Sequence, residues 1–268
     1  MMAPAVLFAG FGTADKTARE AAISSIVRDA AVQFPDLHFV EAYTSAFIRK
    51  RLASLGEHVP SPEECLEELA AEGRDTVYIQ PLHLTPGEEY DNKLRPLLER
   101  YGNRFRRLVL GEPLFYHWAE GVDDDYAAVL DVLRELYPPS AEEVIVLLGH
   151  GSPHRHNPVY ERLQNVIEQG RLPICIGVVE ETDTPDFSMV EIRLSEYGVR
   201  QICLAPLLLS GGIHVTEDMA GKSDASWKSR LETLGYQVRT NLRGLGEYPA
   251  FRQLYMKKLA NLLEKGKL

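Results

Sequence analysis

Cysteine is scarce in this chain, and long apolar runs are missing. The three cysteines are an odd number, and no two of them have CxxC spacing. This excludes a disulfide framework and a zinc knuckle. No apolar segment approaches the roughly 20 residues that span a bilayer. The apolar start at Met1–Gly12 is short and lacks a basic region, so it indicates a first strand and not a signal peptide. We therefore expect a cytoplasmic protein without membrane contact.

Positive charge is also in short supply. Lys and Arg number 29 against 39 Asp and Glu, a formal charge of 29 − 39 = −10, and there is no basic run. Proteins that bind nucleic acid by neutralising phosphates need such a run, so we expect no nucleic-acid partner. An acidic enzyme can still bind a small polyanion if it gathers Arg and Lys inside a cleft. A GxGxxG fingerprint, a Walker motif, a GxSxG elbow and an HExxH motif are all absent.

Short apolar, β-branched runs alternate with amphipathic stretches along the whole chain. Strands are predicted over Pro4–Gly12, Leu37–Ala42, Thr76–Leu84, Arg107–Phe115, Glu143–Gly149, Ile174–Glu180, Gln201–Leu209 and Tyr236–Leu242. Between them lie helical patterns, one of which begins with a capping box at Ser61–Glu64. Alternating strands and helices are typical of βαβ units, so the pattern predicts an α/β fold with mainly parallel four-stranded sheets flanked by helices.

The sequence Pro138-Pro139-Ser140 is the clearest boundary signal, because the strand and helix pattern starts again after it. We therefore predict two similar α/β domains, residues 1–138 and 139–268. The last predicted helix, Pro249–Lys265, could pack back on the first domain.

The restart behaves like an internal duplication, which leaves matching residues at fixed offsets. AGFGT matches LGHGS and pairs Phe11 with His150 at 150 − 11 = 139. HFVEAYT matches IGVVEET and pairs Glu41 with Glu180 at 180 − 41 = 139. QPLHLTPGEE matches APLLLSGGIH and pairs Glu89 with His214 at 214 − 89 = 125. All three matches fall at the carboxyl ends of predicted strands.

Ligands of open α/β sheets bind beyond the carboxyl ends of the strands, so the second-half residues His150, Glu180 and His214 are predicted to converge there. Two imidazoles and one carboxylate suit Fe(II), Co(II), Ni(II) or Zn(II) and leave coordination positions open. Each residue also has a structural explanation: a cap at a strand end for His150, a solvated loop for Glu180 and a flexible glycine loop for His214. The first half offers Glu88 or Glu89 as a further candidate, and the repeat favours Glu89.

Other histidines give weaker signals. His154 and His156 form an HxH pair in a polar loop, where a solvated entrance is the commoner arrangement. His83, within PLHLTP, is more typical of a structural residue.

Several motifs, in this order, resemble the anaerobic cobalt chelatases of cobalamin biosynthesis, the CbiK group. They are FGT, EAYTSAFIRKRL, QPLHLTPGEEYD, LLGHGS, GVVE, PLLLSGGIHVTEDMAG, DASWKSRLE and GLGE, and they extend over nearly the whole chain. PLHLTPGEEYD and HVTEDMAG are the specific ones. The chain departs from the group at Ser152, where Thr is common, and at Glu181, where Gly is usual.

The resemblance implies a class II chelatase fold, with a cleft between two domains, and insertion of Co(II) into sirohydrochlorin without ATP. It implies metal contacts from His150, Glu180 and His214. Histidine suits this chemistry, because its neutral ring is a ligand and its pKa, about 6.5, suits a base that takes pyrrole protons. His150 is then the principal proton acceptor, His214 shares the catalytic work, and Glu89 assists from the opposite wall.

Two alternatives stay open. Fe(II) insertion for sirohaem uses the same ligand types, and a non-catalytic cytoplasmic carrier of metal or tetrapyrrole needs no turnover. The predicted partners are sirohydrochlorin and Co(II), with Fe(II) as the alternative metal and no cofactor beyond the metal substrate; a homo-oligomer is possible. Because sirohydrochlorin is a polycarboxylate, Arg and Lys must line the cleft, but the sequence does not identify them.

Overall fold

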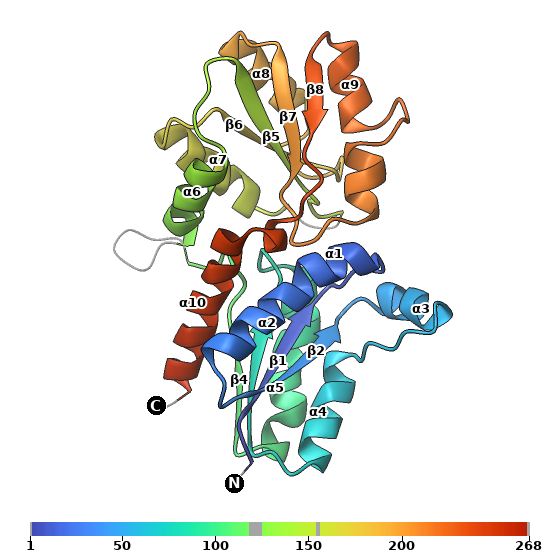
Figure 1. The fold of residues 1–268 in the computed structure, drawn as a ribbon, viewed down its shortest axis with the longest axis vertical. Helices are drawn as coiled ribbons and strands as arrows, with labels where there is room; N and C mark the ends of the chain where they lie inside the picture. Colours follow the sequence, from blue (N-terminus) through green and yellow to red (C-terminus); the bar gives the residue numbers. More distant parts are fainter. Residues whose placement is uncertain (1, 118–124, 154–155, 267–268) are drawn as a thin grey trace. The chain divides into compact units, whose positions relative to one another are not determined.

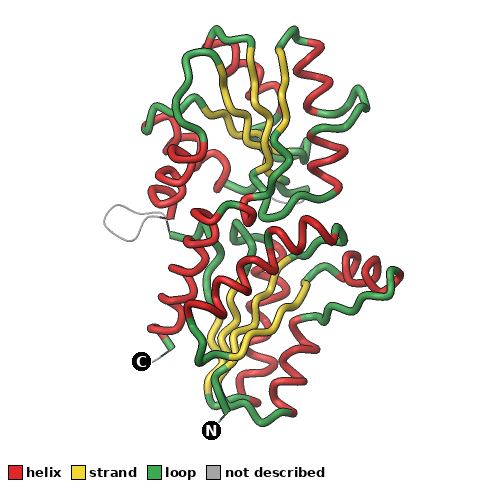
Figure 2. Tube along the Cα trace, in the orientation of Figure 1, coloured by secondary structure: helices red, strands yellow, loops and turns green. Residues whose placement is uncertain are grey.

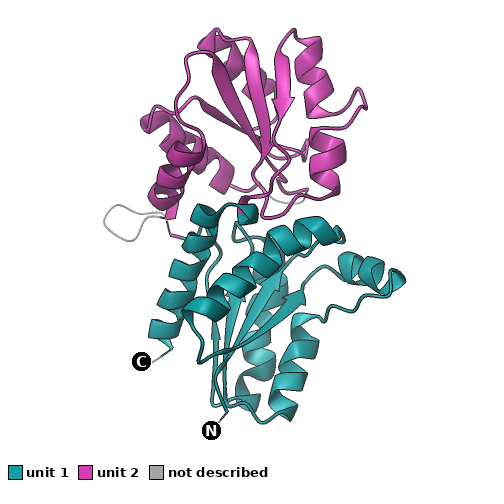
Figure 3. Cartoon of the chain, in the orientation of Figure 1, with its two compact units in different colours: residues 1–116, 246–268 teal, residues 117–245 magenta. Residues whose placement is uncertain are grey.

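The computed structural model describes residues 2–117, 125–153 and 156–266, which form two compact units. Unit 1 contains residues 1–116 and 246–268, and unit 2 contains residues 117–245 (Figure 3). These limits differ from the expected domains 1–138 and 139–268. Helix α6 (Asp125–Leu136) belongs to unit 2, and the last helix, α10 (Pro249–Lys265), belongs to unit 1.

Unit 1 is built around a four-stranded parallel sheet with the order β2-β1-β3-β4 (Figure 1). Its strands are β1 (Ala5–Gly10), β2 (His38–Tyr43), β3 (Thr76–Pro81) and β4 (Arg107–Leu110). Its helices are α1 (Lys16–Ala21), α2 (Ile23–Gln33), α3 (Ala46–Ser54), α4 (Pro62–Ala71), the π-helix η1 (Glu89–Leu94), α5 (Arg95–Tyr101), the 3₁₀ turn η2 (Gly102–Arg104) and α10. A second 3₁₀ turn, η4 (Leu245–Glu247), leads into α10.

Helices cover both faces of this sheet, as Figure 2 shows. Side chains of β1 alternate between the faces, and Leu7 packs with residues of α4, η1 and α5 on one of them. Helices α2 and α10 lie side by side on the other, where Arg252 of α10 donates to Asp29 of α2 at 2.6 Å. The predicted capping box is confirmed at the start of α4: Glu64 N donates to Ser61 Oγ, and Ser61 N donates to the Glu64 carboxylate.

Unit 2 repeats the same parallel topology with the order β6-β5-β7-β8. Its strands are β5 (Glu143–Gly149), β6 (Ile174–Val178), β7 (Gln201–Pro206) and β8 (Gln237–Thr240). Its helices are α6, α7 (Val159–Gln169), α8 (Phe187–Tyr197), the π-helix η3 (His214–Met219) and α9 (Trp227–Thr233). One core cluster joins β5, β6 and β7 to α8, η3 and α9, and it buries Trp227 against the backbone of Gly177.

Two of the three repeat matches are confirmed by the strand register. Gly10 and Gly149 both end the first strand of their unit, and Gly12 and Gly151 both have positive φ (92° and 82°). Leu82 N donates to Ala9 O, as Leu207 N donates to Leu148 O, which fixes the offset of 125 for the third strand. Both π-helices begin at the matched residues, Glu89 and His214.

The match of Glu41 with Glu180 is wrong by four residues. Tyr43 pairs with Gly10 and Val178 pairs with Gly149, and Ser45 N donates to Phe11 O as Glu180 N donates to His150 O. The counterpart of Glu180 is therefore Ser45, at 180 − 45 = 135. Glu41 lies inside β2, where burial raises the pKa of its carboxyl. The identical residues in the two segments do not occupy equivalent positions, because the register of β2 is set by its pairing with β1 and that of β6 by its pairing with β5.

The cysteines and the helix lengths are the remaining features about which the sequence led to an expectation. All three cysteines are free and buried, and burial raises the pKa of the Cys175 thiol to about 12 and that of Cys203 to about 11. No helix in the described part of the chain is long and apolar enough to cross a membrane.

Candidate metal-insertion site

His150 lies immediately after β5, between two glycines that the backbone requires. A Cβ atom at Gly149 would lie 2.3 Å from the Tyr160 ring. Gly151 has a φ of +82°, a region that L residues rarely adopt, and a Cβ there would lie 3.0 Å from Glu180 Cβ. The two glycines therefore let the backbone around His150 approach Tyr160 and the end of β6 closely.

Glu180 follows β6, and the backbone fixes it beside His150. Glu180 N donates a hydrogen bond to His150 O at 2.9 Å. The side chains of the same two residues also lie close together, with 3.8 Å between His150 Nδ1 and Glu180 Oε1. Among the described residues, Arg171 is the one non-glycine residue with positive φ, so Glu181 fits its position without the glycine usual there. The loop after β6 thus delivers a carboxylate to the imidazole of the adjacent strand.

His214 is the third predicted residue, and it reaches the same place from the first turn of η3. Its ring lies edge-on to the His150 ring, with 4.5 Å between centroids and 85° between planes. The three predicted side chains therefore converge, from the ends of three strands of one sheet. Within the described ranges no group of three or more His, Cys, Asp or Glu side chains is placed to hold a metal ion.

Both imidazoles turn Nδ1 toward an oxygen acceptor. His150 Nδ1 lies 3.2 Å from Gly151 O, and His214 Nδ1 lies 2.6 Å from Asp218 Oδ2. A carbonyl or carboxylate oxygen accepts a hydrogen bond, so the proton of each neutral ring belongs on Nδ1. In the part of the chain that is described, neither Nε2 has a hydrogen-bond partner. Imidazole nitrogen and carboxylate oxygen are ligand types that divalent transition metals accept.

A buried carboxylate, Asp183, links the loops that carry His150 and Glu180. Its side chain is fully buried and accepts hydrogen bonds from the backbone N–H groups of Ser152 (2.9 Å), Asn157 (3.2 Å) and Thr184 (2.8 Å). It also lies 2.9 Å from His156 Nδ1. His156 itself is exposed, and its ring contacts the buried Asp183 carboxylate; His154 lies outside the described residues.

Glu89 occupies the matching position in unit 1, at the start of η1. Its carboxylate accepts a hydrogen bond from Thr44 Oγ1 and forms an ion pair with Lys93. Glu88 is exposed, whereas Glu89 is partly buried. His83 lies beside this group, with Nε2 at 3.5 Å from Thr44 Oγ1, and burial lowers its pKa to about 4.

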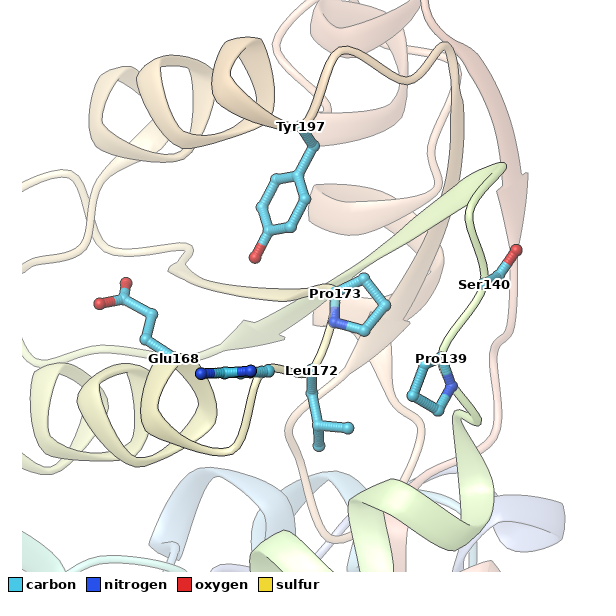
Figure 4. A pocket seen from close by; sticks show the side chains of 7 residues that line it. Pro139, Ser140, Glu168, Leu172, Pro173 and Tyr197 are labelled. Atoms are coloured by element: carbon cyan, nitrogen blue, oxygen red, sulfur yellow. The ribbon is translucent and has the colours of Figure 1, made fainter.

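A separate pocket of about 360 Å³ lies at the other end of the unit 2 sheet (Figure 4). It is lined by Pro139 and Ser140, shortly before β5, by Pro173, immediately before β6, and by Glu168, Arg171, Leu172 and Tyr197. His150 and Glu180 follow the same strands at their carboxyl ends. The pocket is therefore not the site of the convergent histidines.

Comparison with known sequences shows the family. The sequence model of the family described as cobalt chelatase (CbiK) matches residues 4–264. The chain belongs to the CbiK cobalt chelatase family. A sirohydrochlorin cobaltochelatase of Salmonella typhimurium is 33% identical over 264 residues, which are 98% of this chain and 97% of the relative. The sirohydrochlorin cobaltochelatase CbiKC of Nitratidesulfovibrio vulgaris is 31% identical over 95% of this chain and 88% of its own length.

Solved structures support the fold. SirB from Bacillus subtilis with Fe³⁺ superposes with a TM-score of 0.63 at 16% identity, over 97% of this chain and 96% of SirB. SirB of the subspecies spizizenii in complex with cobalt gives a TM-score of 0.60 at 15% identity, over 99% and 97% of the two chains. The CbiK family member described here therefore has the two-unit α/β architecture of these chelatases.

Sequence reasoning missed the supporting residues of the site. Asp218 and Lys93 carry a local signal, because each lies four residues after a predicted site residue on one helix. Asp183 carries no spacing signal, since its partners come from a loop 26 to 31 residues earlier in the chain.

Proposed function

We propose that this CbiK family protein inserts Co(II) into sirohydrochlorin and releases two protons, without ATP. The observation that carries the proposal is the convergence of His150, Glu180 and His214 beyond one sheet edge in a chain of this family. The two relatives named above are both sirohydrochlorin cobaltochelatases. The metal is a substrate that enters with water ligands and leaves in the macrocycle.

His150 and His214 bind Co(II) through Nε2, and Glu180 supplies an oxygen ligand and charge compensation. Three ligands hold the ion more weakly than a closed four-ligand cage, so macrocycle nitrogens can displace the remaining water. As the macrocycle nitrogens replace His150 on the ion, the lone pair of His150 Nε2 becomes free while the pyrrole protons are still leaving. It can then accept a pyrrole proton, which makes His150 both a metal contact and the principal base.

Glu89 is the second acceptor in this proposal. Its support is the repeat, which gives Glu89 the position of His214 at the start of a π-helix. Lys93 and Thr44 hold the carboxylate in one orientation.

The decisive experiment mixes purified protein with sirohydrochlorin and Co(II) and follows the visible spectrum over many turnovers. We expect His150→Ala to abolish accelerated insertion while its circular dichroism spectrum stays that of the wild type. His58→Ala is the matched control, because it removes an exposed imidazole from unit 1. Near-normal turnover by His150→Ala would refute the assignment, and stoichiometric binding without turnover by the wild type would favour a carrier.

Iron insertion for sirohaem is the alternative reaction of the same site. His and carboxylate ligands accept Fe(II) as well as Co(II), and intrinsic affinity does not set metal choice. The same assay with Fe(II) under anaerobic conditions ranks the two metals by rate. We also propose a cytoplasmic location, which suits three free thiols.

A further inference from the structure

The two π-helices carry an interacting side-chain pair at the same two positions. In η3 the first residue, His214, contacts the fifth, Asp218; in η1 the first residue, Glu89, contacts the fifth, Lys93. The offsets are 214 − 89 = 125 and 218 − 93 = 125, the offset that the strand register gives. The residue types differ between the two units, but in both π-helices the side chain of the fifth residue forms an ion pair or hydrogen bond with the side chain of the first.

Helix geometry explains this contact. A π-helix makes i→i+5 hydrogen bonds, so residues four apart lie on nearly the same face, one turn apart. His214 Nδ1 and Asp218 Oδ2 lie 2.6 Å apart, a short charge-assisted hydrogen bond. Both side chains are about 40% exposed (40% and 43%), so without this bond water would compete for both ring nitrogens.

The bond also selects a tautomer. An ionised carboxylate only accepts hydrogen bonds, so the proton of a neutral His214 ring is held on Nδ1 and the lone pair on Nε2. The carbonyl oxygen of Gly151 favours the same tautomer of His150, with the proton on Nδ1. The two rings, with 4.5 Å between their centroids, therefore both keep Nε2 free of the hydrogen bonds that hold Nδ1.

We propose that Asp218 is a positioning residue of the insertion reaction: it fixes the tautomer and the ring orientation of His214 so that Nε2 is ready for Co(II). The proposal rests on the proposed function for its catalytic meaning, since His214 is a metal contact there. Carboxylates that hold a ligating histidine in this way typically change metal affinity or activity by about 10- to 100-fold when they are removed.

The same helix provides a matched control. Glu217 precedes Asp218, its side chain is exposed, and among the described residues it forms no hydrogen bond or ion pair with His214. Glu217→Ala therefore removes one negative charge from η3 without touching the imidazole. Asp218→Asn is the conservative variant, because its amide oxygen can still accept from Nδ1 but carries no charge.

The kinetic experiment measures initial insertion rates while Co(II) and sirohydrochlorin are varied separately. We expect Asp218→Ala to lower kcat/KM for Co(II) by about 10- to 100-fold, Asp218→Asn to lie between it and the wild type, and Glu217→Ala to stay within about twofold. KM for sirohydrochlorin should change little, because the carboxylate acts through His214. Equal effects of Asp218→Ala and Glu217→Ala would overturn the proposal.

A tautomer measurement tests the inference without turnover. Long-range ¹H–¹⁵N correlation spectra of ¹⁵N-histidine protein are recorded in the alkaline range where imidazoles are neutral, with His214 assigned by its absence in His214→Gln. We expect the Nδ1–H form in the wild type and a shift toward Nε2–H, the form favoured in water, in Asp218→Ala. An unchanged tautomer, or a changed tautomer with wild-type kinetics, overturns the proposal; a wild type that inserts no metal refutes the proposed function instead.

Discussion

Replacing Asp183 by Asn tests whether a buried carboxylate holds the site loops together. Asp183 is 1% exposed, and its two oxygens accept from three backbone N–H groups in addition to facing His156. Oδ1 faces Asn157 N, Thr184 N and His156 Nδ1, whereas Oδ2 faces Ser152 N. An asparagine has one acceptor oxygen and one NH₂ group in the same volume.

The magnitude follows from this count of acceptors. If the amide oxygen takes the place of Oδ1, the NH₂ group faces Ser152 N–H, and one buried donor loses its partner. The opposite orientation removes the acceptor of Asn157, Thr184 and His156 and costs more. A hydrogen bond to a charged group contributes about 1.5–3 kcal/mol, so losing one bond and the charge of the others should lower the free energy of unfolding by about 3 kcal/mol.

The assay is urea-induced unfolding followed by tryptophan fluorescence, since Trp227 lies in the core of unit 2. Asp186→Asn is the matched control: Asp186 is the N-cap of α8, accepts from Met189 N, and lies three residues further along. Asp and Asn are comparable N-caps, so this variant should lose less than about 1 kcal/mol. If Asp183→Asn is no less stable than Asp186→Asn, the carboxylate does not hold the loops together.

Two further predictions rest on burial. Burial lowers the pKa of His83 to about 4, below the ordinary 6.5. As the pH falls, the histidine of the unfolded chain therefore takes up a proton before that of the folded protein. The stability that comes from keeping His83 neutral is fully present above pH 6.5 and is lost as the pH falls toward 4. Between about pH 7.5 and pH 5 the wild type should lose about 2 kcal/mol more than His83→Gln in urea titrations; identical pH dependence of the two proteins would contradict this. Burial also raises the pKa of all three cysteine thiols, so the native protein should react with a chromogenic disulfide at about pH 8 only after denaturant is added, and rapid labelling of the native protein would show otherwise.

Local pattern was sufficient for the order of the strands along the chain, although most predicted strands run past the observed carboxyl ends. The apolar run predicted β5 with its observed bounds, the cap signals predicted the start of α4, and the amphipathic pattern predicted the bounds of α10. These predictions succeeded because strand alternation, capping and proline at a first helical position act between residues close in the chain. The restart after Pro138 likewise indicated the repeated architecture of two four-stranded sheets.

Non-local pairing decided the rest. The counterpart of Glu180 is Ser45 and not Glu41, because strand register is set by hydrogen bonds to β1 and β5 and not by matching letters. Helix α10 joins unit 1, although it follows unit 2 in sequence, because its apolar side packs against α2 and β3.

The sequence by itself determined which residue types could bind a metal and at which strand ends they stand, since parallel strands carry their carboxyl ends to one sheet edge. Only the tertiary structure decided how they are held. The Asp183 carboxylate reaches back across a loop, and Asp218 fixes His214 through a π-helix that the sequence pattern did not predict. Such contacts depend on backbone directions between segments, which hydrophobic periodicity does not encode.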